Sequence, residues 1–194
     1  MVRLRSANAC NQSSNEWQRL EWKFRIPKGF QPTTKFCHLH QLKAQEGNNG
    51  APLITISTRC DEDGGNKRVQ VIHTGDTRTS GKGVIIDNLP LADFEDEWIQ
   101  VETEMHYTHH GTFRIKLTRI SDGKVLADQS FADVDLWRKG ATSIRNKFGI
   151  YRSLGRKMQS ASDRPDNGFK DESLQLADFK VYEAHTNPNP QPHD

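Results

Sequence analysis

Two histidines stand two residues apart in the apolar segment FCHLHQLKAQ. If this segment is a β-strand, His38 and His40 point to one face, and Cys37, Leu39 and Gln41 point to the other, because successive side chains alternate. A pair of imidazoles on one face could bind a metal ion, could provide a catalytic base with a helper, or could simply be solvated. The two histidines are therefore the first candidates for chemistry.

A second segment, NKFGIYRS, combines a cation, a glycine and a phenol. In an extended conformation Lys147, Gly149 and Tyr151 share one face, and Phe148 and Ile150 are left for the core. The absence of a side chain at the glycine allows a ligand to approach the backbone closely. We expect this strand to form part of the floor of a concave binding groove.

The rest of the chain predicts the elements that must position these residues. Leu20, Trp22 and Phe24 alternate with polar residues, as in a half-buried strand, and segments such as EGNNGAP and DEDGGNKR have the composition of turns. Eight or more short strands and little helical periodicity predict an all-β protein, an antiparallel β-sandwich of the jelly-roll (concanavalin-like) type. Strands are expected at 16–26, 36–44, 52–60, 68–74, 81–90, 98–108, 112–120, 124–131, 147–153 and 174–184, and one helix at 132–140.

Length and composition limit the classes of function. A chain of 194 residues predicts one domain, at 1–185, and the proline-rich end without apolar residues predicts a disordered tail at 186–194. The 27 basic and 25 acidic residues are spread along the chain without a basic block, which argues against a nucleic-acid or membrane-surface partner. No segment has the length of a membrane span.

The cysteines and the first residues leave the cellular compartment open. Cys10, Cys37 and Cys60 are too few for a disulfide framework, although one pair and one free thiol would be consistent with them. The opening segment has a basic start but lacks the apolar stretch of a signal peptide. The chain is therefore expected to be cytoplasmic, or a mature or N-terminally truncated form of a secreted protein.

Several segments resemble motifs of the β-jelly-roll polysaccharide lyases. The HLH segment at 38–40 is similar to the Gln-Ile-His strand motif of the alginate lyases, with His in place of Gln. Lys147, Gly149 and Tyr151 match the Tyr-x-Lys-Ala-Gly-x-Tyr-x-Gln motif of the same family. RLEW at 19–22 is similar to the Arg-Ser/Thr-Glu-Leu motif.

The chain resembles the heparin lyase and glucuronan lyase group more closely. Segments like FxHxHQxK, a Gly-Ile-Tyr-Arg strand and a closing ADFKVYE strand occur here in the same order, and the resemblance covers most of residues 17–184. Arg145, Phe148 and Ser153 depart from the alginate lyase motif, which has Tyr, Ala and Gln there. The subsite residues of that family therefore cannot all be carried over.

The N-terminal arginines are a further departure. In the heparin lyase group an Arg-containing strand precedes the strand that ends in WKFRI, and here that upstream strand is short or missing. Arg3 or Arg5 would be closer to the position of that arginine than Arg19.

The resemblance implies a lyase that cleaves a uronic-acid-containing polysaccharide by β-elimination, without a catalytic metal. The reaction removes the C5 proton next to a carboxylate and expels the 4-linked sugar oxygen, so negative charge develops on the carboxylate and must be stabilised. The residues expected to bind the substrate or neutralise its carboxylate are His38, Gln41, Arg19, Arg59, Lys147 and Arg152.

A base and an acid must also lie within hydrogen-bond reach of the reacting atoms. Tyr151 is expected to be the acid, and beside Lys147 or Arg152 it could also act as the base of a syn elimination. His40 would be the base of an anti elimination, and otherwise a neutralising group. The sequence leaves both alternatives open.

The same resemblance implies an acidic polysaccharide as partner, no nucleic acid or membrane partner, a monomer, and a secreted or periplasmic location. No cofactor is implied for catalysis, and a structural calcium ion is compatible with the family.

Two other classes of function remain. The His-x-His pair followed by Glu46 resembles the start of a cupin metal motif, although the spacing to the glutamate is longer than in cupins. A non-catalytic carbohydrate-binding module would use Trp98, Trp137 and Tyr107 to stack on sugar rings. The further histidines in HYTHHG are expected to be solvated in a hairpin turn.

Overall fold

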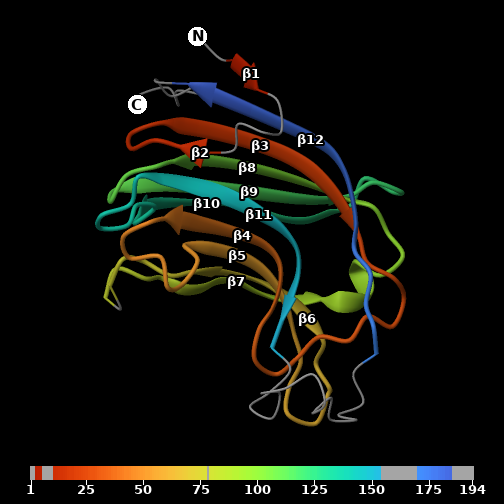
Figure 1. Cartoon of the computed structure of the whole chain (residues 1–194). Helices are drawn as coiled ribbons and strands as arrows, with labels where there is room; N and C mark the ends of the chain where they lie inside the picture. Colours follow the sequence, from red (N-terminus) through yellow and green to blue (C-terminus); the bar gives the residue numbers. More distant parts are fainter. Residues whose placement is uncertain (1–2, 6–10, 78, 154–169, 185–194) are drawn as a thin grey trace.

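The protein is an antiparallel β-sandwich. A computed structural model describes residues 3–5, 11–77, 79–153 and 170–184 (Figure 1). Within this part, two six-stranded sheets have the strand orders β1-β12-β3-β8-β9-β10, called sheet A, and β2-β11-β4-β5-β6-β7, called sheet B. The predicted all-β jelly-roll fold is confirmed.

The strands correspond closely to the expected segments. Sheet A contains β1 (Arg3–Arg5), β3 (Trp17–Arg25), β8 (Ile99–His106), β9 (Gly111–Arg119), β10 (Val125–Val134) and β12 (Gln175–Ala184). Sheet B contains β2 (Asn11–Gln12), β4 (Cys37–Gln45), β5 (Ile54–Arg59), β6 (Arg68–His73), β7 (Gly83–Pro90) and β11 (Ser143–Arg152). A short 3₁₀ helix, η1 (Leu91–Asp93), follows β7.

The core lies between the two sheets and follows from side-chain alternation. In β3 the side chains of Leu20, Trp22 and Phe24 are fully buried and the residues between them are partly exposed. The same alternation continues in β8 and β9. Burying each large apolar side chain stabilises the fold by about 1.5–3 kcal/mol, so the facing apolar rows hold the sheets together.

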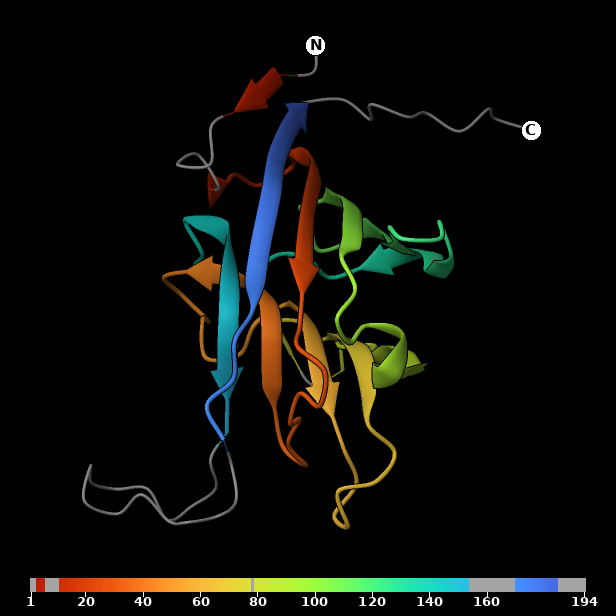
Figure 2. The same cartoon turned by 90° about the vertical axis from the view of Figure 1, so that its right-hand side faces the viewer.

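The sandwich is bent. In Figure 1 the strands curve in a common direction, with β4 and β11 on the inner side of the bend and β12 and β3 on the outer side. Figure 2 shows β12 and β3 side by side on the outer side, in agreement with their pairing. The face of sheet B that points away from the core therefore lies on the inner side of the bend.

The helix predicted at 132–140 is wrong. β10 continues to Val134 through a bulge at which Asp133 has a φ of 52°, and the chain after it forms no helix. The backbone N–H of Leu136 donates to the carbonyl of Thr108 at 2.9 Å. Since Leu136 is also buried, packing and this bond hold the segment extended, against its local helix propensity.

A buried arginine fixes the end of this segment. Arg138 is 2% exposed, and its guanidinium donates hydrogen bonds to the carbonyls of Ala51, Pro52, Thr74 and Gly75. Backbone carbonyls thus satisfy a charge that would otherwise be costly to bury.

The structure bears on several further predictions. Cys37 and Cys60 are free thiols, and Cys10 lies outside the described residues. The predicted tail at 186–194 also lies outside them, so the domain boundary stays a prediction. In the described part of the chain no helix is long and apolar enough to cross a membrane.

Candidate functional site

A row of polar side chains crosses sheet B. Four of them lie directly opposite one another on neighbouring strands. Tyr151 of β11 is opposite His38 of β4, His38 is opposite Ser57 of β5, and Ser57 is opposite Gln70 of β6. The side-chain amide of Gln70 donates to a carboxylate oxygen of Asp87 in β7 at 2.7 Å. Directly opposed residues of antiparallel strands lie on one face, so these five side chains are neighbours. We call them the polar row.

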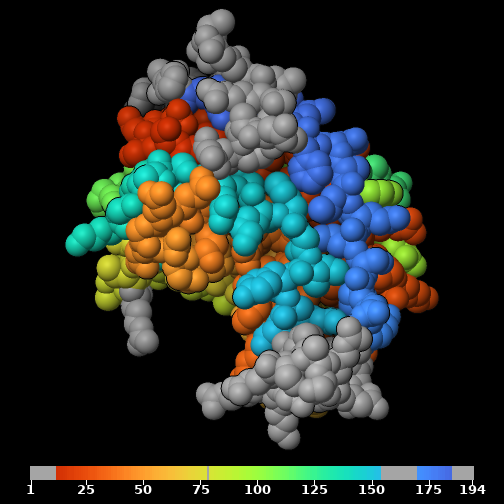
Figure 3. Space-filling view, in the orientation of Figure 1, coloured from red at the N-terminus to blue at the C-terminus, as the bar shows by residue number. Residues whose placement is uncertain are grey.

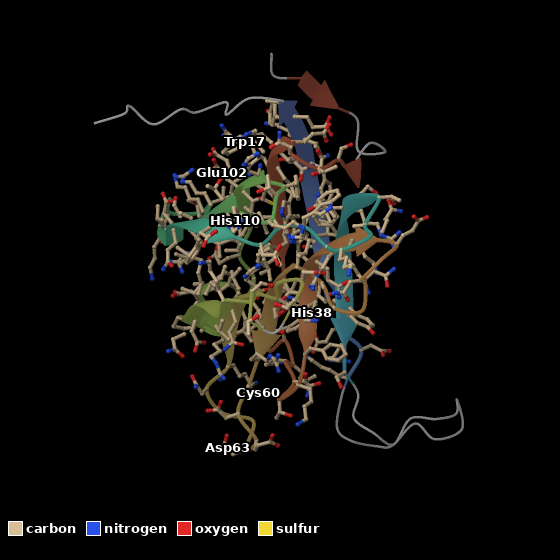
Figure 4. All side chains as sticks on the ribbon, turned by 90° about the vertical axis from the view of Figure 1, so that its left-hand side faces the viewer. Trp17, His38, Cys60, Asp63, Glu102 and His110 are labelled. Carbon is tan, nitrogen blue, oxygen red and sulfur yellow. The ribbon has the colours of Figure 1, made fainter. Side chains whose placement is uncertain are left out.

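The polar row lies on the outer face of sheet B. Ile54 and Ile56 of β5 are buried in the core, so Thr55, Ser57 and Arg59 point away from it. Figure 4 views this side of the molecule and labels His38, on β4 beside β11.

From Ser57 through His38 to Tyr151, exposure increases strongly. Ser57 is 0% exposed and His38 9%, whereas Tyr151 is 60% exposed. Tyr151 is therefore the member of this trio best placed to meet a large ligand from solvent.

Hydrogen bonding determines the tautomer of His38. Its Nδ1 lies 2.7 Å from Oγ of Ser57, and that hydroxyl donates its only hydrogen to Oγ1 of Thr55 at 3.0 Å. Nδ1 must therefore be the donor to Ser57, which leaves the lone pair on Nε2. Burial, and secondly the charge of Arg59, lower the pKa of His38 to about 4. At neutral pH this side chain is an uncharged imidazole that can accept a proton at Nε2.

Aromatic contacts hold His38 and Tyr151 together. The ring of Phe36 stacks on His38, with centroids 5.1 Å apart and planes inclined by 12°. Tyr151 lies 5.1 Å from Phe36 and 6.1 Å from His38 between ring centroids. The structure therefore brings one catalytic candidate, Tyr151, next to a histidine that was expected only to bind substrate.

The faces predicted for β11 agree with the structure. Lys147 and Tyr151 are exposed, whereas Phe148 and Ile150 pack against the core. Gly149 has a φ of 128°, and a Cβ added there would meet no atom within 4 Å. The outer face is thus open above this glycine.

His40 does not share a face with His38, and this part of the prediction is wrong. Between the two histidines β4 advances by two residues while the pairing with β5 advances by only one, so a β-bulge at Leu39 shifts the alternation. The ring of His40 lies 5.5 Å from that of Trp22 and 5.0 Å from that of Phe148. His40 is 2% exposed and lies inside the sandwich, away from the polar row.

Inside the core, His40 belongs to a chain of polar groups. Its Nε2 lies 2.9 Å from Oδ1 of Asn146, whose amide donates to Gln18 at 3.1 Å, and the hydroxyl of Tyr107 donates to the same Gln18 oxygen at 2.8 Å. Burial lowers the pKa of His40 to about 4, although the bond to Asn146 acts in the opposite direction. Tyr107 is 0% exposed, so the expectation that it stacks on a sugar ring is wrong.

Arg19 also lies away from the polar row, contrary to prediction. It lies on β3 between core residues and points to the outer face of sheet A. Its guanidinium pairs with Glu21 at 2.8 Å and Glu102 at 3.3 Å, and it lies 5.9 Å from the ring of Tyr182. The earlier strand β1 belongs to the same sheet, where it pairs with β12. The similarity of RLEW to the lyase motif therefore does not bring this arginine to the site.

The remaining binding candidates lie closer to the polar row. Gln41 is directly opposite Lys147 on the outer face, one row beyond His38 and Tyr151. Arg59 lies on the same face and donates to the carbonyl of Thr34 at 3.2 Å. Four of the expected residues, with His38, are thus brought together: Gln41, Arg59, Lys147 and Tyr151.

Arg152 is held at the margin of this face. Its guanidinium donates to the carbonyls of Gln31 at 3.4 Å and Lys170 at 3.0 Å, and its register partner is the buried Cys37. Arg152 therefore connects β11 to the segments at Gln31 and Lys170, a structural role that the sequence did not indicate.

The sequence interpretation also omitted residues that the structure places in the row. Ser57, Gln70 and Asp87 were not considered as site residues, although the alternation of β5 already separates Ser57 from the core. Gln70 and Asp87 can be found only from the pairing of β6 with β5 and of β7 with β6.

The histidines do not form a metal centre of the expected kind. His38 and His40 point to opposite faces, so they cannot ligate one ion together. In the described ranges, no group of three or more His, Cys, Asp or Glu side chains could hold a metal ion. His109 and His110 instead contact Asp135 and Asp133 at 2.8 and 2.7 Å.

Comparison with known proteins shows the fold. No family model and no curated protein matches the chain. An alginate lyase from Pseudomonas aeruginosa is similar in structure, with 17% identity, a TM-score of 0.50, and coverage of 88% of this chain and 67% of that chain. A polysaccharide lyase of family 18 has 10% identity, a TM-score of 0.53, and coverage of 94% and 78%. Arcelin-5, a lectin-like defence protein from Phaseolus vulgaris, has 9% identity, a TM-score of 0.50, and coverage of 87% and 71%.

Proposed function

We propose that this protein is a polysaccharide lyase that cleaves an acidic, uronic-acid-containing polysaccharide by β-elimination. The observation that carries the proposal is the pair of Tyr151 and the uncharged His38 on a sheet face that also carries Lys147 and Arg59. The similarity in fold to an alginate lyase and to a family 18 polysaccharide lyase supports this reaction class.

We infer a role for each group from its position. Nε2 of His38 accepts the C5 proton, the C5–H electron pair forms the C4–C5 double bond, and the bond from C4 to the leaving oxygen breaks. The hydroxyl of Tyr151 donates a proton to that oxygen. Arg59, Lys147 and the amide of Gln41 surround the carboxylate, where negative charge develops in the transition state.

This assignment replaces His40 as the base. A ring that is 2% exposed and bonded to Asn146 inside the core does not reach a polymer on the outer face of sheet B. We propose instead that His40 stabilises the sandwich.

The chemistry also supports proposals on location and cofactors. A long acidic polymer is met outside the cytoplasmic membrane, so we propose a secreted or periplasmic protein that acts as a monomer. The residues assigned above supply the base, the acid and the positive charge, so we propose that catalysis requires no cofactor. The experiment with a chelator tests both proposals: that catalysis requires no metal ion, and that a structural calcium ion is compatible with the fold.

The test is the ultraviolet absorbance of the new C4–C5 double bond. Purified protein is mixed with alginate, glucuronan, heparin, pectate or ulvan, with and without a chelator. We expect a rise on one polymer that survives chelation and is lost in Tyr151→Phe. Tyr182→Phe, on sheet A, is the matched control and should remain active. An absence of any rise, or a fully active Tyr151→Phe, would refute the proposal.

A carbohydrate-binding protein without chemistry is the second candidate. The lectin-like arcelin-5 is similar in fold, and the outer face of sheet B carries amide and hydroxyl groups that suit sugar hydroxyls. Binding of one of the five polymers without any rise in absorbance would favour this candidate.

A further inference from the structure

Three cations gather on the outer face of sheet B beyond the polar row. Arg145 of β11 lies directly opposite Lys43 of β4, and Lys147 lies one row nearer to the polar row, opposite Gln41. Leu42 and Ala44 are buried, so Lys43, which lies between them, points outward. We call Lys43, Arg145 and Lys147 the cation cluster.

The cation cluster has no internal counter-charge. Across 3–5, 11–77, 79–153 and 170–184, no carboxylate forms an ion pair with any of its three members. Two outer-face cations of sheet A are paired, by contrast: Arg114 with Asp128 at 2.9 Å, and Lys23 with Asp178 at 2.5 Å.

The arrangement costs stability in the free protein. Like charges directly opposite each other on antiparallel strands are destabilising. Burial lowers the pKa of Lys43, and the neighbouring charges of Lys147 and Arg145 lower it further. An external anion at this place would remove the repulsion and gain three charge interactions.

We infer that the cation cluster is a subsite that binds carboxylates of an acidic polysaccharide lying along β4 and β11. Lys43 comes five residues after His38 on the same strand, a separation of roughly 16 Å at ~3.3 Å per residue. This distance is longer than one sugar ring, so Lys43 and Arg145 would hold sugars beyond the cleavage point, and Lys147 lies between them and the polar row. The identity of the polymer rests on the proposed function, but the binding does not require turnover.

The surroundings favour a polysaccharide over a nucleic acid. The cluster has only three cations, and the amide of Gln41 lies directly opposite Lys147. The polar row on the same face adds the amide of Gln70, the hydroxyl of Ser57 and the carboxylate of Asp87. The amide and hydroxyl groups suit sugar hydroxyls. Nucleic-acid surfaces instead use more extended positive charge.

The test compares the binding of two double variants with that of the wild type. Lys43→Gln/Arg145→Gln removes two charges from the cluster and leaves Lys147, which we place in the catalytic machinery, intact. Lys116→Gln/Lys180→Gln removes two charges from the outer face of sheet A and is the matched control. Binding to alginate and to glucuronan is measured by isothermal titration calorimetry at low and high salt, with single-stranded DNA as a third ligand.

We expect the cluster variant to bind alginate or glucuronan about tenfold more weakly than the wild type does at low salt. The difference should shrink at high salt, because exposed charges are screened. The control variant should bind within about twofold of the wild type, as distant surface charges contribute little.

Each other outcome overturns the inference. The inference is refuted if the cluster variant binds as tightly as the wild type, or if the control variant is weakened equally. It is also refuted if neither uronate polymer binds. Tighter binding of DNA than of both polymers would identify a nucleic-acid surface. The proposed function fails separately: if the cluster variant loses binding while the wild type forms no double bond, the subsite stands and the lyase reaction does not.

Discussion

Acidification should destabilise the protein through His40, whose environment gives the sharpest quantitative prediction. The pKa of His40 falls from its ordinary 6.5 to about 4 in the folded state, because its ring is buried between Trp22 and Phe148. The unfolded chain therefore binds a proton at pH 5 that the folded protein does not. The contribution of neutral His40 to stability is complete above pH 6.5 and is lost as the pH falls toward 4.

The size of the effect follows from the shift. A difference of about 2.5 pKa units is worth about 3 kcal/mol at 1.36 kcal/mol per unit, and the slope near pH 5 is about 1.2 kcal/mol per pH unit. His38 has a similar shift and adds a similar slope, so the wild type alone cannot separate the two.

The assay is urea denaturation between pH 4.5 and 8, with the wild type and His40→Gln. An amide at position 40 can keep a hydrogen bond to Asn146 but cannot titrate. We expect the variant to be less stable at pH 7.5 by about 1–2 kcal/mol, because the shape of the core changes, and its stability to depend less on pH. An unchanged slope in the variant would show that His40 titrates as an exposed histidine and would refute its placement in the core.

Three shorter predictions concern the polar row and its strand. Tyr151→Phe should lower turnover at least about a hundredfold with little change in melting temperature, because the hydroxyl is exposed; absorbance and thermal melts test this, and a parallel loss of stability would contradict it. Ser57→Ala removes the partner of His38 Nδ1, so ¹⁵N NMR of the imidazole should show a mixture of tautomers, and turnover should fall about tenfold. An unchanged spectrum would be evidence against the hydrogen bond from Nδ1 to Ser57. Gly149→Ala should destabilise by about 1–3 kcal/mol in urea because of its φ of 128°, whereas wild-type stability would mean that the backbone there is relaxed.

Much of the site could be predicted because β11 alternates regularly. Its exposed Lys147 and Tyr151 and its inward-facing Phe148 follow the two-residue period of a strand. The faces alternate in this way even though the pairing of β11 with β4 shifts register between Phe148 and Tyr151, so the period alone was sufficient to place these side chains.

The strand β4 shows why the same reasoning failed for His40. Apolar side chains occur at Cys37 and Leu39 and then at Leu42 and Ala44, so their spacing changes from two to three in the middle of the strand. That change marks the bulge and is visible in the sequence, but an expectation of strict alternation overlooks it.

Sheet membership could not be read from local pattern. β3 and β4 follow one another in the chain but belong to different sheets, and for this reason Arg19 and His38 lie on opposite sides of the molecule. The space-filling view in Figure 3 shows the chain's early and late segments mixed over one surface. Such long-range pairing depends on the whole fold rather than on any single segment.

The four backbone carbonyls that accept hydrogen bonds from Arg138, here called the carbonyl cage, have a kinetic consequence. Its hydrogen bonds join Arg138 to residues 63 to 87 positions earlier in the chain, so the cage closes only after two distant turns have been brought together. Contacts of this kind form late in folding and, when they break, mainly speed unfolding. We therefore expect Arg138 to lengthen the lifetime of the native state, and stopped-flow unfolding of Arg138→Met, set beside its refolding rate, would measure that contribution directly.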